Sequence, residues 1–81
     1  MSRGLGDVYK RQIMIRQKVG NKIKTLRHLN GLSQEKLALN AGLDRTYIAS
    51  VENGNRNISI VNLEKITNAL GVSLGEFFSG I

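Results

Sequence analysis

The chain has 81 residues, a length that fits one domain, and it carries 12 Lys and Arg residues against 6 Asp and Glu. It contains no cysteine, which excludes a disulfide framework and a thiolate metal site. The net charge of +6 weakly favours a polyanionic partner. No stretch approaches the roughly 18 apolar residues of a membrane span and no signal peptide is visible, so we expect a cytoplasmic protein with no membrane partner.

The first twelve residues, MSRGLGDVYKRQ, show no helical or strand periodicity. The stretch DVYKRQ is also the translation of GAT GTG TAT AAG AGA CAG, which resembles the transposon mosaic end used in sequencing-library preparation. We therefore interpret residues 1–12 as a disordered extension derived from an adaptor, with the folded domain in residues 13–81. The alternative is a disordered basic arm. Without these residues, which hold three positive charges and one negative, the net charge falls from +6 to +4.

Proline is absent and β-branched alternation is scarce, so the chain is predicted to be all-helical. The first helix is expected over about residues 15–29. Val19, Ile23 and Leu26 recur at i, i+4 and i+7 and therefore face inward. Gly31 is predicted to end this helix.

Cap residues and glycines predict the next two helices. Ser33 is the expected N-cap of a helix over Gln34–Ala41, and Gly42 ends it. Asp44 is predicted to cap a third helix that ends near residues 53–54.

Two further helices are expected after the polar loop NGNRN. Ser59 is predicted to cap a helix that Gly71 ends, and Ser73 is predicted to cap a short last helix, LGEFF. The inner face of the fourth helix carries Leu63, Ile66 and Leu70. The sequence thus predicts an all-α domain of five helices.

The residues around the second and third helices have the spacing of a helix-turn-helix. Ala38 is small where the two helices would touch, and Gly42 can take a positive φ in the turn between them. Leu37, Ile48 and Val51 can fill the wedge between these helices and the rest of the core. Each match is weak alone, but five in register indicate a helix-turn-helix.

The run GLSQEKLALNAGLDRTYIASVENGNRNISIVNLEKITNALGVSLGEFF resembles the lambda-repressor-like, Cro/Xre-type helix-turn-helix family. The similarity covers roughly Val19 to Phe78. Within that family, LDRTYIASVENGNRNISI most resembles the controller proteins of restriction–modification systems. The resemblance implies a compact five-helix domain that binds a palindromic operator in double-stranded DNA as a homodimer, in a bacterium or phage. A phage- or plasmid-type repressor and an antitoxin-like protein-interaction module are the alternatives.

The outward face of the third helix carries mostly small polar residues, where solvated helices usually carry long charged ones. A recognition helix must let its backbone approach the base edges of the major groove, which is about 12 Å wide. Thr46, Ala49 and Ser50 are short enough for that, and Arg45 is long enough to bind a guanine O6/N7 pair. These four residues are the predicted base-reading set; a merely solvated helix is the alternative.

Other residues are expected to hold the DNA backbone. Gln34 matches a family position where a glutamine and a helix N-terminus meet a phosphate. The resemblance implies similar contacts for the loop residues Asn53, Asn55, Arg56 and Asn57, for which a plain polar loop is the alternative. The Tyr47 hydroxyl can donate to a phosphate, or the ring can pack against the second helix.

Arg27 and Glu52 match family positions that form an ion pair between the first and third helices. On the helical wheel Glu52 lies beside Ile48, at the edge of the core, where it does not face a phosphate. The alternative for Arg27 is a phosphate contact.

The C-terminal segment offers more apolar surface than a small domain easily buries. At least one of its two phenylalanines is expected to fill the core, and the sequence does not decide which. The predicted dimer interface comprises Val61, Leu74, Phe77, Phe78 and Ile81. No catalytic constellation, metal-ligand cluster or glycine-rich phosphate loop is present, so we expect no enzyme activity, metal, cofactor or small-molecule ligand.

Overall fold

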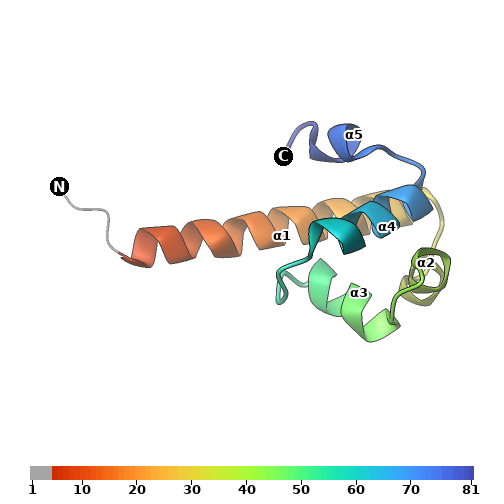
Figure 1. The fold of residues 1–81 in the computed structure, drawn as a ribbon, viewed down its shortest axis with the longest axis horizontal. Coiled ribbons are helices and arrows are strands. Elements are labelled where there is room, and N and C mark those ends of the chain that lie inside the picture. Colours follow the sequence, from red (N-terminus) through yellow and green to blue (C-terminus); the bar gives the residue numbers. More distant parts are fainter. Residues whose placement is uncertain (1–4) are drawn as a thin grey trace.

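The computed structural model describes the backbone of residues 5–81 and the side chains of residues 10–81. This part of the chain is all-helical (Figure 1), which confirms the predicted fold class. Its helices are α1 (Leu5–Leu29), α2 (Gln34–Ala41), α3 (Arg45–Glu52), α4 (Ile60–Leu70) and α5 (Leu74–Phe78). In the view of Figure 1, α5 lies on the side of the domain opposite to α2 and α3, with α1 and α4 between them.

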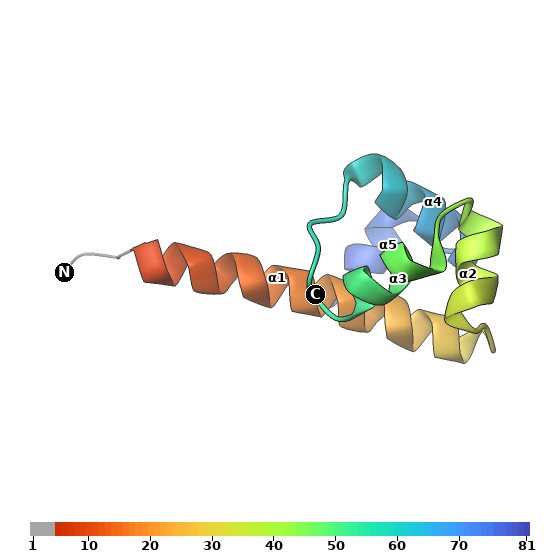
Figure 2. The ribbon, with the colours of Figure 1, turned by 90° about the horizontal axis from the view of Figure 1, so that it is seen from below.

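Helix α1 is longer than predicted, because it begins at Leu5 and not near Ile15. The first half of α1 extends beyond the other helices in both views (Figures 1 and 2), so it needs no inward-facing apolar stripe. The Lys, Arg, Gln and Met residues of this segment have high helix propensity, which the search for periodicity overlooked. Residues 1–4 lie outside the described residues. The disorder predicted for residues 1–12 does not hold for the described residues 5–12, which are helical. The derivation of residues 1–12 from an adaptor stays a prediction.

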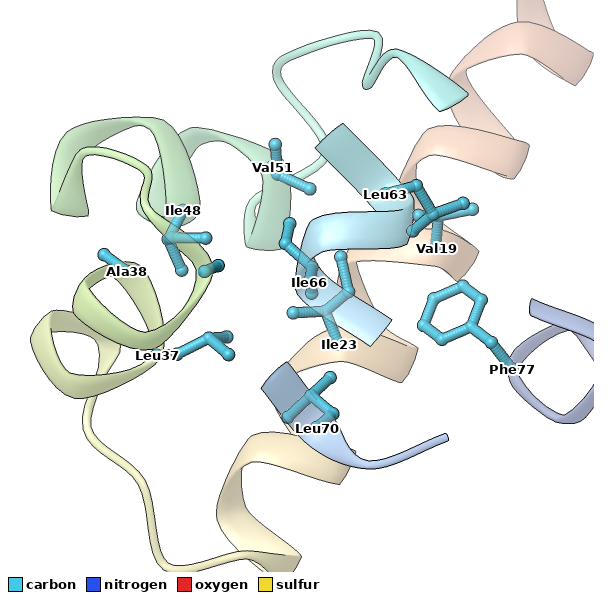
Figure 3. Close-up of a cluster of buried hydrophobic side chains, with 11 residues drawn as sticks. Val19, Ile23, Leu37, Ala38, Ile48, Val51, Leu63, Ile66, Leu70 and Phe77 are labelled. Atoms are coloured by element: carbon cyan, nitrogen blue, oxygen red, sulfur yellow. The ribbon is translucent and has the colours of Figure 1, made fainter. Parts of the chain in front are cut away.

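The core lies where the C-terminal half of α1 meets the other helices (Figure 3). Ile23, Ile48 and Ile66 are fully buried there, and each comes from a different helix. The remaining buried apolar side chains are Val19, Leu37, Ala38, Ala41, Val51, Leu63, Leu70 and Phe77. These residues include the predicted inner faces of α1 and α4, except that Leu26 is only partly buried. The core therefore fixes the helix-turn-helix against α1 and α4.

Three of the four predicted N-caps bond as expected. The side chains of Ser33, Ser59 and Ser73 accept hydrogen bonds from backbone N–H groups in the first turns of α2, α4 and α5. The prediction for Asp44 was wrong in part, because this residue occupies the N-cap position but its side chain makes no capping hydrogen bond. Asp44 is exposed, so water can solvate its carboxylate instead.

Glu76 completes a capping box at the start of α5. Its carboxylate accepts a hydrogen bond of 2.9 Å from the backbone N–H of Ser73. This bond, with a contribution from the Ser73 side chain, holds the pKa of Glu76 below its ordinary value.

Gly20 lies where α1 packs directly against the C-terminal end of α3. It is buried in the middle of α1, and a Cβ atom built there would clash with the backbone carbonyl oxygens of Val51 and Glu52. Because backbone atoms cannot turn aside as a side chain can, only glycine lets α1 approach α3 this closely. The sequence predictions did not single out Gly20.

We expect Gly20→Ala to lower the free energy of unfolding by about 1–3 kcal/mol, although alanine favours a helix over glycine by about 1 kcal/mol. Urea denaturation followed by circular dichroism measures this difference. Gly75→Ala is the matched control, since a Cβ at this glycine in α5 would make only an ordinary contact of 3.8 Å with Ser73 Oγ. Equal stability of the two variants would contradict the close approach.

Candidate nucleic-acid interface

Helix α3 has one face in the core and one toward solvent. Ile48 and Val51 are 0% and 2% exposed. Of the predicted base-reading residues, Arg45 and Thr46 are exposed, whereas Ala49 and Ser50 are partly buried. The four residues lie within two turns of one helix, and Arg45 is its first residue. The free side of α3 therefore carries one long cation at the N-terminal end and short side chains after it.

A tight turn places α3 against α2 (Figure 2). Gly42 adopts a left-handed conformation with φ of 71°, which alanine would strain. The backbone N–H of Leu43 donates to the Ala38 carbonyl at 2.9 Å and closes the end of α2. This bond and the core contacts of α2 fix the direction in which α3 points.

Arg27 and Glu52 form a bidentate ion pair between α1 and α3. Arg27 Nε donates to Glu52 Oε2 at 2.7 Å and Arg27 Nη2 donates to Oε1 at 3.0 Å. The remaining guanidinium nitrogen, Nη1, donates to the Leu32 carbonyl at 2.9 Å. Both residues are buried, 6% and 4% exposed. The Arg27 guanidinium is thus committed to the interior, and the alternative of a phosphate contact was wrong.

Gln34 joins this ion pair. Its Nε2 donates to Glu52 Oε1 at 3.1 Å, so Glu52 accepts from residues of both α1 and α2. Gln34 is the first residue of α2 and is partly exposed. The bond orients the amide at the N-terminal end of α2, a contact that the sequence predictions missed.

Tyr47 is held between α4 and the loop that follows α3. Its ring packs partly against the core, and its hydroxyl oxygen accepts a hydrogen bond of 3.1 Å from Asn62 Nδ2. The guanidinium carbon of Arg56 lies 4.9 Å from the centroid of the ring, a cation–π distance. The structure thus brings Tyr47 and Arg56 together, and it adds Asn62, which the sequence predictions missed.

The loop between α3 and α4 keeps its polar side chains at the surface. Asn53, Asn55 and Asn57 are exposed. The loop backbone is fixed, because the N–H of Asn55 donates to the Ser50 carbonyl at 3.0 Å. Gly54 has a φ of 75°, and a Cβ there would lie 2.9 Å from Gln17 Cγ of α1. The loop asparagines are therefore free to meet a ligand, and Arg56 and Asn57 of the same loop also line a groove beside Phe78.

The predicted dimer-interface residues divide into two groups. Val61, Phe78 and Ile81 are 61%, 40% and 37% exposed. The prediction for Phe77 was wrong, because this residue is fully buried in the core, and Leu74 is partly buried against the same core. In a short helix the inward direction admits only one of two adjacent phenylalanines. The Phe78 ring packs edge-on against Phe77, with centroids 5.2 Å apart.

Phe78 also lines an apolar groove of about 220 Å³ on the surface. Ile15 of α1 and Ile60 of α4, which are 47% and 68% exposed, line the same groove. The apolar surface around Phe78 is therefore continuous across three helices.

A family model described as helix-turn-helix matches residues 23–77. The chain belongs to the helix-turn-helix family. This family comprises DNA-binding regulators and is not a family of enzymes. Among the described residues of this helix-turn-helix protein, no helix has the length and apolar character needed to cross a bilayer.

Similar proteins narrow the group within the family. The control protein C.MunI of a Mycoplasma species is 54% identical over 68 residues, which cover 83% of this chain and 92% of that protein. The structure of the restriction–modification controller protein C.AhdI from Aeromonas hydrophila matches with a TM-score of 0.78 and 45% identity, over 80% of this chain and 98% of that one. These similarities confirm the predicted resemblance to controller proteins.

A third similar protein is known in complex with DNA. The controller protein C.Esp1396I, crystallised as a tetramer with its natural 35-base-pair operator, matches with a TM-score of 0.75 and 44% identity. The match covers 79% of this chain and 84% of that one.

Proposed function

We propose that this protein is a sequence-specific transcriptional regulator of the restriction–modification controller type, which binds a palindromic operator as a homodimer. The observation that carries the proposal is the solvent side of α3, where exposed Arg45 precedes Thr46, Ala49 and Ser50 while the opposite side fills the core. The operator complex of the similar protein C.Esp1396I supports it. A regulator that works on a bacterial or phage operator acts in the cytoplasm.

The chemistry of α3 suits base reading in the major groove. Arginine can donate two parallel hydrogen bonds to guanine O6 and N7, the commonest specific contact to that base. The short side chains of Thr46, Ala49 and Ser50 let the helix backbone approach the base edges, and a threonine methyl can contact a thymine methyl. We therefore assign base reading to these four residues.

The residues around α3 suit contacts to the phosphates. Gln34 lies at the N-terminus of α2, where free backbone N–H groups favour an anion. Tyr47 and Arg56 offer a hydroxyl and a guanidinium, and Asn53, Asn55 and Asn57 offer exposed amides beside them. Such contacts fix the register of the protein on the duplex and carry little sequence information.

The apolar surface around Phe78 suits a second copy of the chain. One helix-turn-helix domain reads only a half-site, and two half-sites lie about 34–36 Å apart, so a two-fold dimer is needed. Val61, Phe78 and Ile81 are exposed apolar residues of α4, α5 and the C-terminus. We place them in a self-complementary interface, with Leu74 at its edge.

Selection of the full chain on a randomised DNA pool tests the proposal. We expect the wild type to select a palindrome, and Arg45→Ala to lose about 1–3 kcal/mol of discrimination at one position in each half-site. Arg45→Lys is the matched control for charge. It should keep the salt dependence of binding but lose the discrimination, because lysine lacks the planar fork.

If the wild type binds every sequence alike, with an affinity set only by salt, α3 does not read bases. The antitoxin-like interaction module would then replace the regulator. If Arg45→Ala discriminates as well as the wild type, Arg45 reads no base and base reading rests on the other three residues.

A further inference from the structure

Asn62 links the start of α4 to the solvent side of α3. Its backbone N–H donates to the Ser59 hydroxyl at 3.1 Å, so the N-cap of α4 fixes the position of the residue. Its side-chain Nδ2 donates to the Tyr47 hydroxyl oxygen at 3.1 Å in a partly buried contact. A side chain of α4, which has no assigned part in DNA binding, thus bonds to a polar group of α3.

This hydrogen bond leaves the Tyr47 hydroxyl with a proton to donate. A phenol has one proton and accepts through its lone pairs. Here one lone pair accepts the hydrogen bond from Asn62 Nδ2, so the proton stays free to be donated. On the ring face, the guanidinium carbon of Arg56 lies 4.9 Å from the centroid. Arg56 is exposed, and it forms no ion pair with an acidic side chain among the described residues. The Tyr47 ring is therefore a contact that can orient its guanidinium, and Arg56 also lines the apolar groove beside Phe78.

We propose that Asn62 is a positioning residue for DNA binding: through Tyr47 it holds Arg56 in the orientation that binds a phosphate of the DNA backbone. The inference rests on the proposed function, and it adds the contacts from Asn62 to Tyr47 and from Tyr47 to Arg56. A phosphate accepts charge-assisted hydrogen bonds from a guanidinium and a further bond from a hydroxyl. A side chain that is already oriented loses less conformational freedom when it binds.

Three residues are needed because the side chains of Arg56 and Tyr47 are each mobile unless a neighbour holds them. Arginine has many rotamers, and an exposed one populates several of them in the absence of a contact. The ring removes part of this freedom only if the ring itself is fixed. The core fixes one edge of Tyr47, and Asn62 fixes its hydroxyl. Loss of Asn62 should therefore act on DNA binding through Arg56.

Titrations of the full chain with its selected operator and with a scrambled duplex, at several salt concentrations, test this chain of contacts. We expect Arg56→Ala to weaken binding about tenfold and to reduce the slope of log K against log salt by about 1, the value for one phosphate contact. Asn62→Ala should weaken binding about fivefold, the equivalent of one hydrogen bond. Both losses should be the same on the two duplexes, because a phosphate contact does not read sequence.

The double variant separates positioning from an independent contact. If Asn62 acts through Arg56, Asn62→Ala causes no further loss in the Arg56→Ala background. Asn68→Ala is the matched control, an exposed asparagine on the same helix, and it should leave affinity and slope unchanged. An additive loss in the double variant, or equal affinity of Asn62→Ala and Asn68→Ala, overturns the proposal.

Tyr47→Phe keeps the proposal testable if Asn62→Ala does not fold. It removes the acceptor of the Asn62 bond together with the phosphate donor proposed for Tyr47, and it keeps the ring beneath Arg56. It should therefore weaken binding at least as much as Asn62→Ala, and the part that acts through Arg56 should vanish in the Arg56→Ala background. An affinity equal to that of the wild type contradicts the positioning chain.

Nuclear magnetic resonance of the free protein distinguishes failure of this inference from failure of the proposed function. The Tyr47 ring should shift the Arg56 side-chain protons upfield in the wild type, and Asn62→Ala should reverse much of that shift. If the wild type selects no operator but Asn62→Ala still reverses the upfield shift of the Arg56 protons, the proposed function alone fails. Unchanged Arg56 shifts in Asn62→Ala, with operator selection intact, defeat the positioning role alone.

Discussion

Glu52→Ala is expected to lower the free energy of unfolding by about 3–5 kcal/mol, the usual cost of removing one partner from a buried ion pair. The substitution leaves the Arg27 guanidinium buried with only the Leu32 carbonyl as a partner. Gln34 Nε2 loses its acceptor as well. A small domain has only about 5–15 kcal/mol to lose, so denaturation by urea, followed by circular dichroism, should show a large shift of the midpoint.

Two further variants show whether the ion pair itself causes the loss. Glu64→Ala replaces an exposed glutamate of α4 and should change stability by no more than about 0.5 kcal/mol. The double variant Arg27→Met with Glu52→Met should regain much of the stability that Glu52→Ala loses, because no buried charge is left unpaired. A loss in Glu52→Ala no larger than that in Glu64→Ala would contradict a role of the pair in joining α1 to α3.

Helix ends were predictable where a local signal fixes them. The bounds of α2 and α5 are those predicted, because a serine N-cap lies directly before each helix. A glycine with positive φ also ends α2. The start of α1 was wrong, since no cap and no apolar periodicity mark a helix that extends beyond the core. Asp44 shows the limit of the cap rule, because its side chain stays in solvent.

The two faces of α3 were predictable, but the contacts that orient its neighbours were not. Periodicity places Ile48 and Val51 inward and therefore Arg45 and Thr46 outward. The bonds from Gln34 to Glu52 and from Asn62 to Tyr47 join residues 18 and 15 positions apart. No spacing rule within one helix predicts such pairs. They depend on how α2 and α4 pack on α3.

Gly20 is a different case, because the sequence itself carries a signal for its role. A glycine inside a helix costs about 1 kcal/mol relative to alanine, so its occurrence in α1 indicates a packing constraint. The partner in this constraint cannot be predicted from the sequence, because the carbonyl oxygens of Val51 and Glu52 reach Gly20 only through the packing of α3 on α1.

Phe77→Ala is expected to lower the free energy of unfolding by about 3–5 kcal/mol, because it leaves a cavity in the core. Phe77 is 0% exposed and packs among Val19, Ile23 and Leu63 (Figure 3). The adjacent Phe78 is 40% exposed, so Phe78→Ala should lose clearly less than Phe77→Ala, because part of its ring already contacts water in the folded protein. Thermal and urea denaturation of both variants measure the difference. If Phe77→Ala does not fold, Phe77→Leu should show a smaller loss in the same direction.

Self-association should depend more on Phe78 than on Phe77, the reverse of the order expected for stability. In the proposed dimer Phe78 contacts the second copy, so Phe78→Ala should raise the dimer dissociation constant in sedimentation equilibrium while the monomer stays folded. Phe77→Leu should alter dissociation much less, because its side chain does not reach the surface. Equal dissociation constants for Phe78→Ala and the wild type would remove the Phe78 surface from the interface. Two-fold operator binding would then require contacts elsewhere, and the exposed Val61 of α4 would be the next residue to test.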